Sequence, residues 1–475
     1  MEQPRSASVL AQYPQPDTAR LSAALAAEAN ANQRKIIVLD DDPTGVQTVH
    51  DIFVYTDWSI ESLRKGFAAP EKLFFILTNS RGFTVAETTK AHIEIAEHVD
   101  QVAREFGMDY LIISRGDSTL RGHYPLETDL LRQVAEKKGG FAMDGEILCP
   151  YFKEGGRFTL DNVHYVRYGD ELVPCGQTEF AKDETFGYTS SNLCDYIEEK
   201  TAGKFRAGDI TCISLESLRA LDFDGIEAQL LAVHDFGKVV VNAVEDCDVQ
   251  AFAVALYRAM AKGRHFTIRC AAALVKAIGN ISSQPLLSRE QMVTLKSSAG
   301  GIIVVGSHTK KTTAQLEELK KVPGIEFIEM DSDKVLVPGA LEQEAASIIE
   351  RCARLIQQGT TCCVSTKRTV LTLPDDTPEA ALVRSVAISD ALQSCVGKLP
   401  VTPAFVVAKG GITSSDVGVK ALRVQCARVL GQIRPGIPVW QTGPESLFPG
   451  TPYVIFPGNV GEVSTLREAV EILLG

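Results

Sequence analysis

Short runs of apolar and β-branched residues recur along the chain, and longer stretches with an apolar residue every three or four positions separate them. The short runs predict buried strands, because a strand covered on both faces is apolar along its whole length. The longer stretches predict amphipathic helices. The runs lie at 35–39, 73–77, 110–113, 239–244, 302–305, 362–364, 405–407 and 453–455.

The helical stretches fall between these runs. One follows Tyr124 and repeats Leu126, Leu130, Leu131 and Val134; another follows Ser415 and repeats Val419, Leu422, Cys426, Val429 and Leu430. A shorter amphipathic helix is expected at 19–31. Strands that alternate with such helices predict an α/β fold, in which each sheet is largely parallel or mixed and is flanked by helices.

The length of 475 residues predicts more than one domain. The polar segment 280–285 and the pair Gly300-Gly301 interrupt the helical pattern, as is typical of a domain boundary. We therefore expect an N-terminal extension over 1–34, a first domain over 35–285 and a second domain over 300–475.

Composition narrows the class of protein. Hydrophobic residues make up 45% and charged residues 23% of the chain, which is typical of a soluble globular protein. No run reaches the roughly 18 apolar residues of a membrane helix, and the polar N-terminus does not resemble a signal peptide. The 11 cysteines include no C-x-x-C pair, which favours reduced thiols. We expect a cytoplasmic protein with no membrane role, and the net charge of −12 argues against nucleic acid as a partner.

Nearly every predicted strand opens into a polar or glycine-rich loop. Ligands of open α/β sheets bind beyond the carboxyl ends of the strands, so these loops predict two sites. The loops 40–45, 78–81 and 114–122 would line a site in the first half. The loops 306–309, 409–413 and 457–461 would line a site in the second half.

The first-half loops carry charge. Asp40, Asp41 and Asp42 are consecutive, so at most two of them share a face of a strand. They fit either carboxylates that bind or deprotonate a sugar hydroxyl, or an Asp-Pro turn with a helix cap. The loop 114–122 favours a small-anion site over a surface ion-pair network, because two arginines there could clamp a carboxylate between flanking glycines. Its candidate residues are Arg115, Gly116, Asp117, Ser118, Thr119, Arg121 and Gly122, and Arg81 could join them.

The second-half glycines suit phosphate, because glycine lets backbone N–H groups approach an anion. Each loop is a weak signal by itself. Neither a G-x-x-x-x-G-K-[ST] loop nor a G-x-G-x-x-G after a strand occurs, so a P-loop or a plain dinucleotide-binding domain is not expected. The histidines at 50, 123, 164 and 308 form no spaced pairs, and we assign no metal ligands.

At these loops the sequence resembles the four-carbon acid sugar kinases, a family also labelled Hrp-dependent type III effector proteins. The matching residues are Asp41-Asp42-Pro43-Thr44-Gly45, Arg81, Asp117-Ser118-Thr119-Leu120-Arg121-Gly122, Gly306-Ser307 and Gly410-Gly411-x-Thr413. The stretch Cys149-Pro150-Tyr151 to Gly156-Arg157, and Asp183, also fit the family pattern. The similarity runs from about residue 35 to the C-terminus.

The resemblance implies an acid-sugar domain followed by an ATP domain. Phosphoryl transfer would go to a terminal hydroxyl of threonate, erythronate or a 3-oxo-tetronate, with Mg²⁺ accompanying ATP. Substrate contacts would be Asp41 or Asp42, Arg81 and the stretch from Arg115 to Ser118. Nucleotide contacts would be Ser307, Ser365, Gly410, Gly411, Ile412, Thr413 and Gly458. The sequence leaves open whether the chain forms a homodimer.

Two positions depart from the family pattern. Arg115 stands where many members have lysine, which retains the charge but changes its geometry. Phe456-Pro457 precede the last glycine loop where a lysine is frequent, and Lys409 or Lys367 could replace that charge.

On this basis Arg81, Arg115 and Arg121 are expected to hold the substrate carboxylate, and Asp42 or Asp117 to deprotonate the hydroxyl. Two alternatives remain. One is a sugar-acid dehydrogenase or aldolase-like enzyme, which would need a nicotinamide fingerprint or a Schiff-base lysine. The other is a non-catalytic, small-anion-binding interaction protein.

Overall fold

The computed structural model describes residues 2–294, 298–374, 376–458 and 460–475. The chain forms two compact units. The first unit comprises Met1–Gly45 and Asp57–Ser283, and the second comprises Val46–Thr56 and Gln284–Gly475. The short segment Val46–Thr56 thus belongs with the C-terminal half of the chain, although it lies in the N-terminal half of the sequence.

The main sheet of the first unit is parallel throughout. Its order is β10-β11-β6-β12-β5-β2-β4, and every neighbouring pair runs in the same direction. The strands are β2 (Lys35–Asp40), β4 (Leu73–Leu77), β5 (Tyr110–Arg115), β6 (Gly145–Cys149), β10 (Thr211–Ile213), β11 (Gly237–Val241) and β12 (Phe266–Cys270). Parallel strands all end at one edge, which brings the loops that follow them together.

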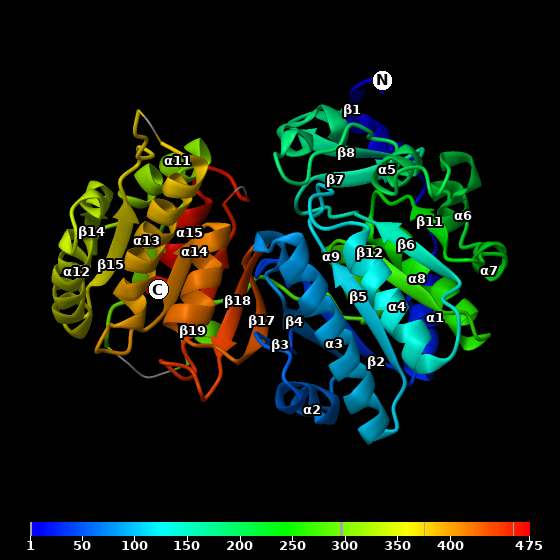
Figure 1. Cartoon of the computed structure of the whole chain (residues 1–475), viewed down its shortest axis with the longest axis horizontal. Helices are drawn as coiled ribbons and strands as arrows, with labels where there is room; N and C mark the ends of the chain where they lie inside the picture. Colours follow the sequence, from blue (N-terminus) through cyan, green and yellow to red (C-terminus); the bar gives the residue numbers. More distant parts are fainter. Residues whose placement is uncertain (1, 295–297, 375, 459) are drawn as a thin grey trace. The chain divides into compact units, whose positions relative to one another are not determined.

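Helices connect and cover these strands (Figure 1). They are α1 (Thr18–Ala31), α2 (Ile60–Ala68), α3 (Val85–Phe106), α4 (Leu126–Gly139), α5 (Leu193–Lys200), α6 (Leu215–Arg219), α7 (Phe223–Leu231), α8 (Asp246–Ala261) and α9 (Ala272–Ile278). The helix expected at 19–31 is α1, which buries Leu21, Leu25 and Ala29 and packs on α8.

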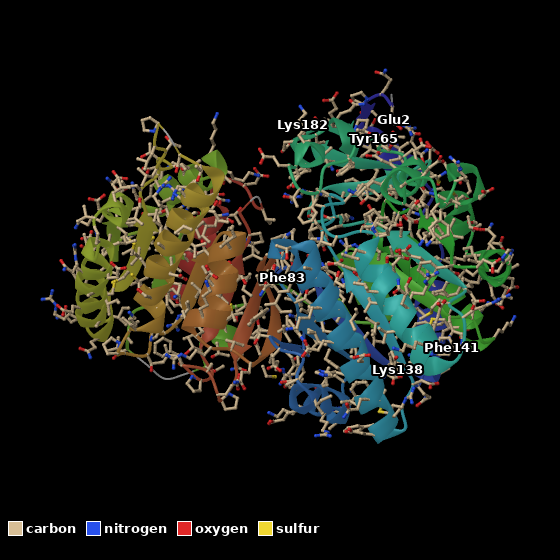
Figure 2. The ribbon with its side chains drawn as sticks, in the orientation of Figure 1. Glu2, Phe83, Lys138, Phe141, Tyr165 and Lys182 are labelled. Atoms are coloured by element: carbon tan, nitrogen blue, oxygen red, sulfur yellow. The ribbon has the colours of Figure 1, made fainter. Side chains whose placement is uncertain are left out.

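A small antiparallel sheet adds to the first unit, in the order β1-β9-β8-β7. Its strands are β1 (Arg5–Ser6), β7 (Arg157–Leu160), β8 (Val163–Tyr168) and β9 (Glu171–Pro174). Tyr165 on β8 and Lys182, in the segment after β9, mark this region in Figure 2.

The sheet of the second unit is mixed. Its order is β3-β17-β18-β19-β16-β13-β15-β14, with parallel pairing from β19 to β14 and antiparallel pairing from β3 to β19. The strands are β3 (Ile52–Tyr55), β13 (Ile302–Val305), β14 (Ile325–Met330), β15 (Thr361–Thr366), β16 (Val406–Lys409), β17 (Cys426–Arg434), β18 (Ile437–Thr442) and β19 (Pro452–Phe456).

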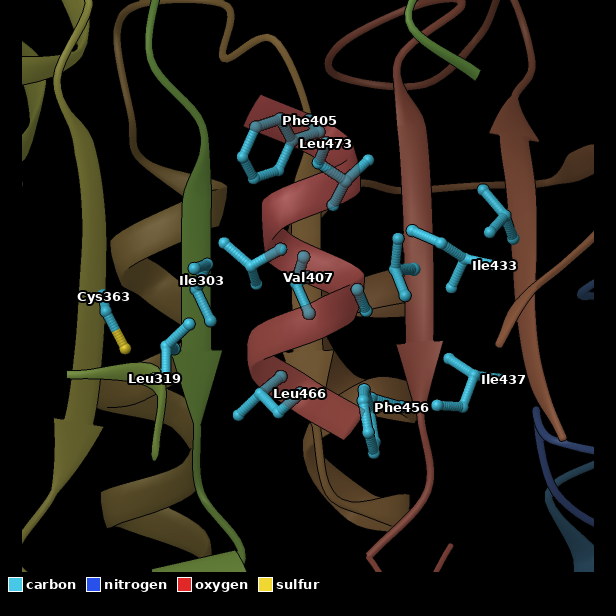
Figure 3. Packing of buried hydrophobic residues seen from close by; sticks show 14 of the residues in the cluster. Ile303, Leu319, Cys363, Phe405, Val407, Ile433, Ile437, Phe456, Leu466 and Leu473 are labelled. Carbon is cyan, nitrogen blue, oxygen red and sulfur yellow. The ribbon is translucent and has the colours of Figure 1, made fainter. Parts of the chain in front are cut away.

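The helices of the second unit are α10 (Arg289–Met292), α11 (Lys310–Leu319), α12 (Ala340–Gln357), α13 (Pro378–Gly397), α14 (Gly411–Asp416) and α15 (Thr465–Leu474). Figure 3 shows buried side chains gathered around α15, where Leu466 and Leu473 meet Ile303, Val407 and Phe456. The α/β fold with parallel and mixed sheets is confirmed. The helices in the described part are all too short or too polar to cross a bilayer.

One predicted helix is wrong. The pattern after Ser415 continues only through α14 and a π-helical turn at Val417–Ala421, and Cys426, Val429 and Leu430 belong to β17. Ala427, Val429 and Ile433 are buried on one face of this strand, an alternation that the helical spacing obscured. Antiparallel pairing with β18 and β3 therefore decides the local structure.

Candidate functional site

The loops that follow β2, β4, β5 and β12 are joined by backbone hydrogen bonds at the carboxyl edge of the first sheet. Asp41 N–H donates to Arg115 O at 3.3 Å, and Arg81 N–H donates to Asp41 O at 3.4 Å. Gly116 N–H donates to Cys270 O at 2.9 Å. The three first-half loops that the sequence singles out therefore meet.

Arg115 lies close to all three aspartates. Its Nη1 lies 3.1 Å from Asp40 Oδ1, 3.5 Å from Asp41 Oδ1 and 3.9 Å from Asp42 Oδ1. Arg115, Asp40 and Asp41 are all buried, with 4% or less of each residue exposed. Both carboxylate oxygens of Asp41 lack a hydrogen-bond partner. The side chain of Asp42 is more accessible, at 15% exposed.

Asp117 links two further arginines. Arg81 forms an ion pair with Asp42 and places its Nη1 3.6 Å from Asp117 Oδ1. Arg121 Nε donates to Asp117 Oδ2 at 2.7 Å. We call Asp40, Asp41, Asp42, Arg81, Arg115, Asp117 and Arg121 the arginine–aspartate cluster. Ser118 belongs to the same loop, and its carbonyl oxygen lies 2.8 Å from His164 Nε2.

Arg269 explains the two flanking glycines. A Cβ at Gly116 would come within 2.2 Å of Arg269 Nη2, and one at Gly122 within 2.6 Å of the same atom. Arg269 also donates to Ser114 Oγ at 2.8 Å and pairs with buried Glu127. The glycines leave room for a buried guanidinium beneath the loop, so they need no bound anion to account for them.

Burial and charge shift two carboxyl pKa values in opposite directions. Burial raises the pKa of Asp40 to about 7, although Arg115 opposes the shift. Burial also favours the neutral form of Asp117, but Arg121 and Arg81 outweigh it and hold the pKa of that carboxyl well below its usual range. Asp117 is therefore a stable anion and a weak proton acceptor.

A divalent cation is chemically compatible with the aspartates. Among the described residues, Asp40, Asp41 and Asp42 offer carboxylate oxygens that all lie within 4.8 Å of one another. Hard cations such as Mg²⁺ prefer oxygen ligands, and the two unpartnered oxygens of Asp41 suit one. Arg115 already supplies positive charge at the same place.

Sequence reasoning left several charged residues out of the candidate set. Arg269 and Glu127 lie under the loop 116–122, and Asp183 Oδ2 lies 3.9 Å from Arg121 Nη1. Arg157 packs on Phe180, with its Cζ 5.4 Å from the ring centroid. Arg157 and Asp183 could have been found from the family pattern, whereas Arg269 and Glu127 stand in ordinary strand and helix sequence.

In the second unit, four parallel strands end at the same level. Val305 is in register with Ser365 and Lys409, and Lys409 with Phe456. The loops after these strands therefore start together. Gly458 faces Ser307, because a Cβ at Gly458 would lie 3.6 Å from Ser307 Oγ. Asn459, in the same predicted loop, lies outside the described residues.

A cavity of about 770 Å³ opens beside these loops, and we call it the glycine-lined cavity. Of the predicted nucleotide contacts, Ser307 and Gly410, Gly411, Ile412 and Thr413 line it, whereas Ser365 and Gly458 do not. Gly410 has a φ of +125°, and a Cβ there would come within 3.1 Å of Ser307 Cβ. Ile412 is 76% exposed and offers an apolar surface at the cavity.

The lysines named as replacements for the missing family lysine are both engaged. Lys409 is fully buried, and its Nζ donates to Pro457 O at 2.5 Å. Lys367 pairs with Asp331 at 2.6 Å and with Asp333 at 2.5 Å. Arg368, in contrast, donates to Ser307 O, and its Nη1 is buried without a hydrogen-bond partner. Arg368 is thus the cation placed against the Ser307 loop.

A second cavity, of about 700 Å³, lies in the first unit at the amino-terminal edge of the sheet. Tyr110 and Phe266, the first residues of β5 and β12, line it together with Phe141 and Lys138 (Figure 2). None of the residues predicted from the sequence as substrate contacts lines this cavity.

Comparison with known proteins covers both halves of the chain. Residues 36–278 match the model of a sugar-binding N-terminal domain, and residues 302–466 match that of a nucleotide-binding C-terminal domain. The chain is 23% identical over 369 residues to D-threonate kinase from Salmonella typhimurium, which covers 76% of this chain and 80% of that protein.

Two crystal structures share the fold. The Haemophilus influenzae protein HI1011 aligns with a TM-score of 0.60 at 17% identity, over 92% of this chain and 100% of that one. A Salmonella typhimurium LT2 protein described as a putative tRNA synthase aligns with a TM-score of 0.65 at 15% identity, over 91% of this chain and 98% of that one.

Proposed function

Because the chain belongs to the four-carbon acid sugar kinase family, we propose that it phosphorylates the terminal hydroxyl of a four-carbon acid sugar with ATP. The acceptor class is threonate, erythronate or a 3-oxo-tetronate. The observation that carries the proposal is the arginine–aspartate cluster, which lies in the part of the chain matched as sugar-binding. The similarity to a D-threonate kinase supports the same reaction class.

We place the acid sugar in a domain spanning 35–285 and ATP in a domain spanning 300–475. Asp41, Asp42, Arg81, the stretch 115–118 and Arg121 would contact the sugar acid. Ser307, Ser365, Gly410–Thr413 and Gly458 would contact the nucleotide. The glycine-lined cavity supports this, because Gly411 is exposed there, so that its backbone N–H group can approach a phosphate, and Ile412 offers an apolar surface to a base.

In this reaction the terminal hydroxyl oxygen forms a bond to the γ-phosphorus, and the bond from that phosphorus to the bridging oxygen of ADP breaks. The hydroxyl proton passes to a carboxylate. We assign that role to Asp42, whose side chain is the most exposed of the three consecutive aspartates. Asp117, with its lowered pKa, would hold Arg81 and Arg121 in place.

Mg²⁺ enters the proposal with ATP, where it neutralises charge on the phosphates when bound. Asp41 is the residue that would contact it, since both of its carboxylate oxygens lack a hydrogen-bond partner and belong to the group compatible with a divalent cation. The protein's own contribution is to position the hydroxyl and to supply fixed positive charge from Arg81 and Arg115.

A coupled assay of ADP release over a panel of four-carbon sugar acids tests the function. We expect turnover with at least one acid and none without acceptor. A thermal-shift screen run beside it distinguishes the alternatives: stabilisation by ATP with Mg²⁺ supports the kinase, and stabilisation by NAD(H) alone supports a dehydrogenase. Absence of turnover and of any nucleotide effect would favour the interaction protein and contradict the proposal.

A further inference from the structure

Arg157 stands at the start of β7, after a tight turn through Gly155 and Gly156. Its N–H donates to Phe152 O at 2.9 Å, and a Cβ at Gly155 would lie 3.1 Å from Arg157 Nη1. Gly156 has a φ of +75°, which favours glycine. The two glycines therefore allow the chain to turn, and Gly155 leaves space for the Phe152 ring and for the end of the Arg157 side chain.

The Arg157 guanidinium has no ion-pair partner among the residues that the structure describes. Arg81, Arg115 and Arg121, which the sequence assigned to the substrate carboxylate, are each paired with aspartates instead. Arg157 Nε is fully enclosed and has no hydrogen-bond partner. Arg157 as a whole is half-buried, and a partly desolvated, unpaired cation is stabilised by an anion that binds to it.

The contacts of Arg157 place its unpaired guanidinium beside the arginine–aspartate cluster. Phe180 packs against two guanidiniums, with Arg121 Cζ 5.1 Å and Arg157 Cζ 5.4 Å from its ring centroid. The charges of Asp117 and Arg121 both act on the pKa of Arg157, although burial has the largest effect and lowers it. Two neighbouring guanidiniums repel each other, and a bound carboxylate would relieve that repulsion.

We infer that Arg157 binds the carboxylate of the sugar acid, with Arg121 beside it and Phe180 holding both side chains. This inference rests on the proposed function and names the residue that selects acids over neutral sugars. Arg81 and Arg115 then serve mainly to hold the aspartates that face the hydroxyl end of the substrate. Lys182, labelled in Figure 2, marks the segment that carries Phe180.

The test compares each acid substrate with its uncharged amide in the wild type and in Arg157→Gln. In the wild type we expect a kcat/KM ratio of acid to amide of about 30 or more, from the usual strength of a charged hydrogen bond. In Arg157→Gln the ratio should fall towards 1, mainly through a higher KM for the acid. Arg157→Lys, which keeps the charge but not the planar fork, should give an intermediate ratio.

Arg167→Gln is the matched control, because Arg167 is an exposed arginine on the neighbouring strand β8 and pairs only weakly with Asp170, at 3.9 Å. Its acid-to-amide ratio should equal that of the wild type. If Arg157→Gln lowers activity equally for acid and amide, or leaves both unchanged, Arg157 does not bind the carboxylate. If the wild type phosphorylates neither acid nor amide, the kinase proposal itself fails.

Discussion

The arginine–aspartate cluster and the glycine-lined cavity are built by different means. The cluster consists of buried charges that neutralise one another, such as Arg115 with Asp40. The cavity is lined at its loops by glycine and hydroxyl residues, and Gly410 and Ser307 approach each other closely there. Ligand binding at the cluster should be sensitive to substitutions that change charge, and ligand binding at the cavity to substitutions that change the backbone conformation.

This difference matches what each proposed ligand requires. A sugar acid is small and is recognised through a few directed, charge-assisted hydrogen bonds. ATP is larger, and its phosphates can be bound by backbone N–H groups that no side chain replaces. Substitutions that change a charge without changing the backbone, or the backbone without changing a charge, therefore test whether the cluster and the cavity differ in this way.

The largest effect is expected for Asp42→Asn. Loss of a proton acceptor typically lowers turnover about 100- to 10,000-fold. The KM for ATP should change little, because Asp42 belongs to the first unit. Steady-state kinetics with saturating acid sugar measures both values, and Asp161→Asn, at an exposed position, is the control. Turnover near the wild-type level would remove Asp42 from the reaction.

A second expectation concerns the pH dependence of stability: the free energy of unfolding should fall with pH because of Asp40 in the first unit and rise with pH because of Lys409 in the second. Folding raises the pKa of Asp40 to about 7, so between pH 4 and 7 the folded chain binds a proton that the unfolded chain has lost. The free energy of unfolding should therefore fall by up to about 1.4 kcal/mol per pH unit as the pH rises through this window. Asp40→Asn should flatten this dependence.

In the second unit, burial lowers the pKa of Lys409 to about 7, and Lys311 contributes. The unfolded chain then binds the extra proton between pH 7 and 10, so stability should rise with pH there. Lys409→Met should remove that rise. Urea unfolding can separate the units, because Trp58 lies in the first and Trp440 in the second, and Trp→Phe at either site leaves one reporter. If Asp40→Asn or Lys409→Met shows the same pH dependence of the free energy of unfolding as the wild type, the shifted pKa assigned to that residue is wrong.

Gly410→Ala should weaken nucleotide binding about tenfold, because a left-handed φ is strained for alanine by about 1–3 kcal/mol. Gly411→Ala is the matched variant, since no atom lies within 4 Å of a Cβ at that position. Its effect on ATP affinity should be much smaller. Calorimetric titration with a non-hydrolysable ATP analogue measures both, and equal losses would show that space at Gly410 is not what matters.

The last pair of variants distinguishes two adjacent cations, Lys367 and Arg368. Arg368→Met should lower ATP affinity about tenfold, as expected for a lost charged hydrogen bond near phosphate. Lys367→Met should change it less than about threefold, because Lys367 is half-buried and already engaged by Asp331 and Asp333. The same titration measures both variants. A larger loss for Lys367→Met would reverse the assignment.

Much of the fold follows from the sequence because buried parallel strands are continuous apolar runs. The run at 73–77 coincides with β4, and the run at 302–305 with β13. The strand β17 was missed because its apolar residues also fit helical spacing, and one of its two pairing partners, β3, lies far earlier in the sequence. Long-range pairing of this kind cannot be seen in local periodicity.

The sequence predicted which loops form the candidate site, but not which side chains in those loops pair with one another. Spacing and charge marked Arg81, Arg115 and Asp117, and the structure brings them together. That these arginines are paired with aspartates, and that Arg157 is not, depends on side-chain packing in three dimensions. Likewise, the glycines at 116 and 122 suggested anion binding, whereas Arg269 accounts for them.

The position of β3 in the sequence affects how the second unit folds during synthesis and how it can be expressed as a fragment. Residues 46–56 leave the ribosome long before residues 284–475, yet they supply the outermost strand of the later unit. A fragment that begins at residue 284 would expose the backbone groups of β17 that β3 normally pairs, and such open strands promote aggregation. Separate expression of the second unit should therefore include residues 46–56, for example joined by a linker ahead of residue 284.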